Sequence, residues 1–204
     1  MAERWYTIGS FTFPASWVAI IASFILTYVF LYFWSRKTSD WYSDGVFYFL
    51  LIWKLSVLVV DFQMVIKHPI TILYFHGGMV GYWLGIMTVL FYIFFKKTAG
   101  TSYLVFAWIS TVAFYELVAH LLGADFLVAV TQFVINGGVT LFLLKKIKGS
   151  DRDTWAVQLV VVFTLLQLFF HSMYGDAVFT TVTWTYLLVM IYLIFFYVRR
   201  KHNE

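Results

Sequence analysis

The sequence of 204 residues contains no cysteine, only two prolines and few charged residues. Without cysteine the chain has no disulfide, no thiolate metal site and no cysteine nucleophile. Charged residues make up 12% of the chain and hydrophobic residues 62%, and the hydrophobic share exceeds that of soluble domains. This composition predicts a multi-pass membrane protein.

The apolar residues fall into seven runs, each near the roughly 20 residues that a membrane-spanning helix needs. We place these runs at residues 13–34, 44–66, 76–95, 101–122, 126–144, 155–173 and 178–198. Pro14 stands at the start of the first run and Pro69 lies before the third, so no proline interrupts a helix interior. We therefore predict an all-α fold in which a single bundle of seven transmembrane helices occupies residues 1–204.

The positively charged residues predict the orientation of this bundle. Most of them follow the first, third, fifth and seventh runs, at Arg36, Lys37, Lys96, Lys97, Lys145, Lys146, Lys148, Arg152, Arg199, Arg200 and Lys201. Because cytoplasmic loops are enriched in lysine and arginine, the N-terminus is expected outside and the C-terminus in the cytoplasm. This arrangement also accounts for the net charge of +4, so no nucleic-acid partner is expected.

Polar side chains gather in the half of the bundle that this orientation places at the outer leaflet. Glu116 and His120 lie four residues apart near the end of the fourth run, and His171 lies near the end of the sixth. Polar groups inside a membrane usually face the bundle interior, because contact with lipid is costly. We therefore expect a cavity open to the outer leaflet. The candidate catalytic residues are His76, Glu116, His120 and His171.

Two charged residues of the second run suggest an interior ionic network. Lys54 lies near the middle of this run, where an ammonium group needs a partner or water. Asp61 lies about two turns further along the same helix, which is too far for a direct ion pair at ~1.5 Å per residue. We therefore expect the partner of Lys54 to come from another helix. Both residues are candidates for substrate binding.

The third run carries Gly77, Gly81 and Gly85 at steps of four residues. Two overlapping GxxxG steps leave a bare backbone stripe, which lets another helix or a lipid approach closely. Gly77 and Gly78 lie at the start of the predicted helix, where unpaired N–H groups favour an anion. With Lys67 just ahead, we expect Gly77, Gly78 and Lys67 to bind the phosphate of an anionic phospholipid.

Four short segments stand in an order found in a known family. They are Ile8-Gly9-Ser10-Phe11-Thr12-Phe13, Asp44, His68-Pro69-Ile70-Thr71-Ile72-Leu73 and His76-Gly77-Gly78. This order resembles the bacterial prolipoprotein diacylglyceryl transferases, and Asn136-Gly137 faintly resembles a later signature of that family. The resemblance implies an enzyme of the bacterial cell membrane that transfers diacylglycerol from phosphatidylglycerol to a lipoprotein precursor. It makes His76 the general base or headgroup partner and Asn136 a substrate-binding residue.

The chain departs from that family at two arginines. No arginine precedes Asn136-Gly137 within residues 131–137, and none lies between Ser172 and Tyr186. The extramembrane arms of the family are also absent. Because a guanidinium group clamps phosphate through two parallel hydrogen bonds, its loss leaves the activity open.

Three alternatives to a lipid-handling transferase therefore stay open. A small-solute or proton-coupled transporter would use Asp61, Lys54 and Glu116 as a relay, and it predicts polar groups throughout the membrane. A non-catalytic membrane assembly protein would use the glycine stripe. A metal-dependent hydrolase would need His76, His120, His171 and Glu116 to converge. Our first choice needs neither a metal ion nor a cofactor.

Overall fold

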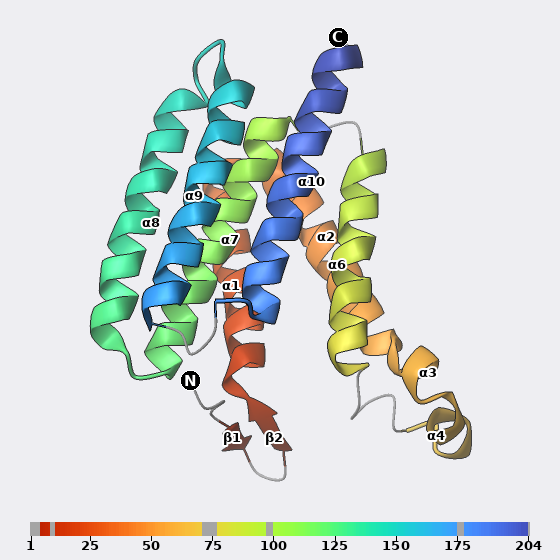
Figure 1. The fold of residues 1–204 in the computed structure, drawn as a ribbon. Coiled ribbons are helices and arrows are strands. Elements are labelled where there is room, and N and C mark those ends of the chain that lie inside the picture. The colour runs from red at the N-terminus through yellow and green to blue at the C-terminus, as the bar shows by residue number, and fades with distance from the viewer. Residues whose placement is uncertain (1–4, 9–10, 71–76, 97–99, 175–177, 204) are drawn as a thin grey trace. The chain divides into compact units, whose positions relative to one another are not determined.

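The computed structural model describes residues 5–8, 11–70, 77–96, 100–174 and 178–203 (Figure 1). Seven helices in these ranges are long and apolar enough to cross a membrane, which confirms the predicted all-α, multi-pass fold. The direction in which the chain crosses the membrane stays a prediction. The chain divides into two compact units, residues 1–34 with 100–204 and residues 35–99. The single bundle over the whole chain also stays a prediction.

A β-hairpin precedes the first helix of the larger unit, in a segment where the sequence predicts no strand. Strands β1 (Trp5–Ile8) and β2 (Phe11–Pro14) pair in antiparallel register, with Trp5 opposite Pro14. Pro14 ends β2 and helix α1 (Ala15–Trp34) follows directly. The Tyr6 hydroxyl donates a hydrogen bond of 3.1 Å to the carbonyl oxygen of Leu122 at the end of α7 (Thr101–Leu122). This bond fixes the hairpin to the end of α7.

Helix α7 is the most buried membrane-spanning helix in the described part of the chain, and it packs against α1. The face of α1 that is buried carries residues at steps of four, which are Ala19, Ser23, Thr27 and Leu31. Trp34 and Phe30 of α1 contact Phe106 of α7, with ring centroids 4.1 and 5.7 Å apart. The small side chains let the two helices approach closely, and the aromatic rings fill the remaining space.

Helices α8 (Phe126–Lys146), α9 (Arg152–Tyr174) and α10 (Thr181–Asn203) complete this unit and pack beside α7 (Figure 1). Asp153 Oδ1 accepts a hydrogen bond of 2.9 Å from the Ser102 N–H in the first turn of α7. At the start of α10, Thr180 Oγ1 accepts from the Thr183 N–H, and Thr183 Oγ1 accepts from the Thr180 N–H. These caps satisfy N–H groups that the helices cannot pair themselves.

The smaller unit begins with α2 (Arg36–Leu55), which starts well before the predicted run at residues 44–66. No proline or glycine stands between residues 35 and 43, so the polar residues there continue the helix. The same run breaks at Ser56 and Asp61 into the short helices α3 (Val57–Val60) and α4 (Phe62–Lys67). Hydropathy detects the apolar run, but it detects neither the polar first turns nor the two breaks.

The glycine stripe of α6 (Gly78–Phe95) is covered by α2. A Cβ atom at Gly81 would overlap the Ser56 hydroxyl and lie 3.0 Å from the carbonyl oxygen of Trp53. A Cβ atom at Gly85 would lie 2.8 Å from the ring of Phe49. The glycines therefore serve the packing of α6 on α2 within the chain. A partner helix cannot use Gly81 or Gly85 without displacing α2. The assembly alternative stays a prediction.

We expect Gly81→Ala to destabilise the protein by about 1–3 kcal/mol, because the added methyl group meets the backbone of α2. The matched control is Gly137→Ala in α8, where a Cβ atom meets nothing described within 4 Å. That change should stabilise the helix by up to about 1 kcal/mol. Unfolding in mixed SDS micelles measures both variants. Equal stability of the two would contradict the packing role of Gly81.

Candidate functional site

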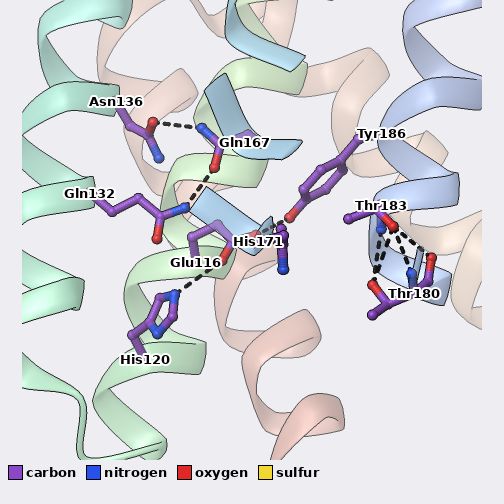
Figure 2. Close-up of polar contacts among 9 residues, drawn as sticks. All are labelled: Glu116, His120, Gln132, Asn136, Gln167, His171, Thr180, Thr183 and Tyr186. Carbon is purple, nitrogen blue, oxygen red and sulfur yellow. Dashed lines mark hydrogen bonds and ion pairs between the residues drawn. The ribbon is translucent and has the colours of Figure 1, made fainter. Parts of the chain in front are cut away.

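Three of the predicted catalytic residues meet at one end of the larger unit, on α7 and α9. Glu116 Oε1 lies 3.0 Å from His171 Nε2, and Glu116 Oε2 lies 3.5 Å from His120 Nε2 (Figure 2). The hydroxyl of Tyr186 on α10 donates a hydrogen bond of 2.5 Å to Glu116 Oε1. We refer to Glu116, His120, His171 and Tyr186 as the Glu116 cluster.

The carboxylate at the centre of the cluster is buried, whereas the two imidazoles are more open. The Glu116 side chain is 3% exposed, against 13% for His120 and 21% for His171. An ionised carboxylate only accepts hydrogen bonds, so His171 carries a proton on Nε2 when it bonds to Glu116. In the neutral ring Nδ1 is then the basic nitrogen. A carboxylate that fixes the tautomer of an imidazole is the arrangement of a general base.

Tyr186 belongs to the cluster but is not among the residues predicted from the sequence. Its ring lies edge-on to Trp108, with centroids 6.0 Å apart, and 6.1 Å from the His171 ring. These contacts aim its hydroxyl at Glu116. Aromatic residues make up 23% of the chain, so one more tyrosine near a helix start gives no signal in the sequence.

A row of three amides lies beside the Glu116 cluster in Figure 2. Gln132 Nε2 donates a hydrogen bond of 2.6 Å to Gln167 Oε1, and Gln167 Nε2 donates one of 2.7 Å to Asn136 Oδ1. All three side chains are buried between α8 and α9. We call Gln132, Gln167 and Asn136 the amide row. Asn136 is one of the substrate-binding candidates predicted from the sequence. In the structure its Oδ1 accepts a hydrogen bond from Gln167.

A separate charged network ties α2 to α6 in the smaller unit. The Tyr92 hydroxyl and the Lys96 ammonium donate to Asp44 Oδ2 at 2.7 and 2.8 Å, and Lys96 also bonds to the Tyr92 hydroxyl. Burial alone would lower the pKa of Lys96, but the hydrogen bonds to Asp44 and Tyr92 raise it above its usual value. Both charged side chains are partly exposed, so this ion pair contributes at most about 1 kcal/mol.

The remaining predicted site residues lie in the smaller unit, apart from His76, which falls outside the described residues. Gly77 is buried, and its N–H donates a hydrogen bond of 3.1 Å to Ser56 Oγ. Gly78 has a positive φ of 55° at the start of α6, a conformation that glycine adopts without strain. Lys54 is half-buried on α2. Asp61, between α3 and α4, and Lys67, at the end of α4, are exposed.

Metal binding gains no support from the arrangement of these residues. Within the described ranges, no group of three or more histidine, aspartate or glutamate side chains could hold a metal ion. Because His76 lies outside these ranges, the ligand set of the metal-dependent hydrolase stays a prediction.

Comparisons with protein-family models, curated proteins and solved structures gave no match. The resemblance to prolipoprotein diacylglyceryl transferases therefore stays a prediction from the sequence. The Glu116 cluster and the amide row are therefore the groups from which we infer a function.

Proposed function

We propose that the protein is a membrane enzyme that transfers a glyceryl group from an anionic phospholipid to an acceptor, with His171 as the general base. The observation that carries this proposal is the hydrogen bond of 3.0 Å between His171 Nε2 and Glu116 Oε1. A carboxylate and an imidazole are costly to bury among apolar helices, and such groups usually mark functional sites. The proposed location is the outer leaflet of a bacterial cell membrane.

The Glu116 cluster supplies a proton acceptor for this reaction. Glu116 holds a proton on His171 Nε2, so that His171 Nδ1 accepts the proton of the attacking group. Tyr186 holds the carboxylate in place, and His120 contributes positive charge beside Oε2 when it is protonated. In this scheme Glu116 and Tyr186 position the base, while His171 contacts the acceptor.

The resemblance suggests a cysteine thiol of a lipoprotein precursor as the acceptor. The sulfur forms a bond to the terminal glyceryl carbon of the diacylglycerol, and the bond between that carbon and the phosphate oxygen breaks. His171 takes the thiol proton and passes it to the departing phosphate, which leaves as glycerol phosphate. His76 stays the proposed headgroup partner. Gly77, Gly78, Lys67, Asp61 and Lys54 stay substrate-binding candidates.

We expect the purified protein in phosphatidylglycerol vesicles to add a diacylglyceryl group to a synthetic peptide with one cysteine in a lipobox. Mass spectrometry of the peptide measures the gain. Glu116→Gln should lower the rate by about 100-fold or more, because the amide no longer stabilises a protonated His171. The control is Asp151→Asn in the exposed α8–α9 turn, which should retain the wild-type rate.

Two results would contradict this proposal. One is a wild-type protein that leaves the peptide unmodified while it is folded and embedded in the vesicles. The other is a Glu116→Gln variant that is as active as the wild type. Circular dichroism on the same vesicle preparations shows that each variant is folded, so that loss of activity is not confused with loss of structure.

Proton-coupled transport is the second candidate, and a specific observation favours it. Buried polar side chains continue along α8 from Gln132 through Asn136 to Thr140, which spans about 12 Å at 1.5 Å per residue. The sequence interpretation places most polar groups in the outer half of the bundle, and Thr140 lies beyond the middle of α8. A pH-sensitive dye inside vesicles would report proton uptake. Uptake that requires Glu116, without any peptide modification, would favour transport over transfer.

A further inference from the structure

The amide row ends in two buried polar atoms that have no hydrogen-bond partner within the described residues, Gln132 Oε1 and Asn136 Nδ2. The two residues are 1% and 0% exposed. A buried polar group without a partner costs about 1–3 kcal/mol, and the acyl chains of lipids cannot supply one. The row therefore lacks one donor, for Gln132 Oε1, and one acceptor, for Asn136 Nδ2.

This requirement does not depend on how the amides are turned. The middle residue, Gln167, uses its oxygen towards one neighbour and its nitrogen towards the other. One end of the row is then left with an oxygen and the other with a nitrogen. Turning all three amides round exchanges the ends, but it still leaves one acceptor and one donor.

A neutral hydroxyl group satisfies both ends at once. Gln132 and Asn136 lie four residues apart on α8, which places them about 6 Å apart along the helix axis. Two hydrogen bonds of about 2.8 Å that meet at one hydroxyl oxygen join atoms about 4.5 Å apart. Residues one helical turn apart have Cβ atoms about 5–6 Å apart, so the ends of their side chains can approach to that distance. A hydroxyl also carries no charge, and a charge would be costly to bury here. In Figure 2 both side chains extend from α8 towards Gln167.

We propose that a hydroxyl group, from a bound water molecule or from the glycerol part of a lipid, bridges Asn136 and Gln132. It accepts from Asn136 Nδ2, donates to Gln132 Oε1, and closes a ring with the two hydrogen bonds of Gln167. Thr164 Oγ1, one turn from Gln167 on α9, is a further buried atom without a partner in the described ranges. This site is independent of the transferase proposal.

Selective labelling of asparagine side chains tests the site, because Asn136 and Asn203 are the only asparagines in the sequence. The full-length protein carries ¹⁵N in these amides and is embedded in phosphatidylglycerol nanodiscs. An Asn203→Asp variant assigns the two signals. We expect the Asn136 amide protons to show a rotating-frame Overhauser cross-peak, either to water or to lipid glycerol protons. Lipid with a deuterated glycerol backbone and headgroup abolishes only the second kind of cross-peak.

The substitution Gln132→Met removes the acceptor and should abolish this cross-peak, whereas Gln158→Met on the exposed face of α9 should leave it intact. An Asn136 amide in the wild type that contacts protein protons only would overturn the proposal. Because this result comes from the wild-type protein, it holds even if Gln132→Met fails to fold. A cross-peak that survives in a folded Gln132→Met variant would also overturn the bridging geometry.

Discussion

Replacing Glu116 by leucine is expected to destabilise the protein by about 2–4 kcal/mol, because two donors on neighbouring helices lose their acceptor. The substitution removes the acceptor at 3.0 Å from His171 Nε2 and at 2.5 Å from the Tyr186 hydroxyl. Both donors come from other helices than Glu116, so α7 loses polar links to α9 and α10 together. Unfolding in mixed SDS micelles measures the free energy.

Glu116→Gln is the matched comparison, because its amide oxygen replaces Oε1 as an acceptor at nearly the same volume. It should cost only about 1 kcal/mol, since Tyr186 and His171 keep a partner. Equal losses in the leucine and glutamine variants would show that the negative charge matters and the hydrogen bonds do not. A leucine variant as stable as the wild type would show that the cluster contributes nothing to stability.

The sequence predicts the membrane-spanning helices well, because each apolar run must satisfy its own backbone in lipid. It predicts their ends less well. Arg36 and Lys37 are expected in a loop, yet Arg36 begins α2 and Lys37 follows in its first turn. The hairpin of residues 5–14 is missed because strands of four residues have too short a pattern to detect.

Depth in the membrane is the signal that identifies Glu116, His120 and His171 from the sequence. Each lies near the C-terminal end of its helix, and the packing of α9 on α7 brings these ends together. Depth says nothing about which faces meet. Tyr186 is missed for that reason, and so is the pairing of Gln167 with Asn136, since both depend on helix rotation. The glycine stripe predicts close packing, but its partner Ser56 emerges only from the structure.

Replacing Gln167 by leucine should cost roughly 2–4 kcal/mol, because one change removes both hydrogen bonds of the amide row. Gln132 Nε2 loses its acceptor at 2.6 Å, and Asn136 Oδ1 loses its donor at 2.7 Å. Each buried group left without a partner costs about 1–3 kcal/mol, and the lower part of that range suits membrane helices. The control Gln158→Leu makes the same change on the exposed face of α9 and should be close to neutral.

Removing the whole row tests the physical reason for this cost. A triple variant with leucine at 132, 136 and 167 leaves no amide to satisfy, so it should be more stable than Gln167→Leu alone. Such non-additivity would show that the single change is costly because it leaves Gln132 Nε2 and Asn136 Oδ1 without a hydrogen-bond partner. A stability that falls further with each leucine would contradict this account. The row would then stabilise the α8–α9 interface through its hydrogen bonds and shape. The two atoms that lose Gln167 as a partner would carry little penalty.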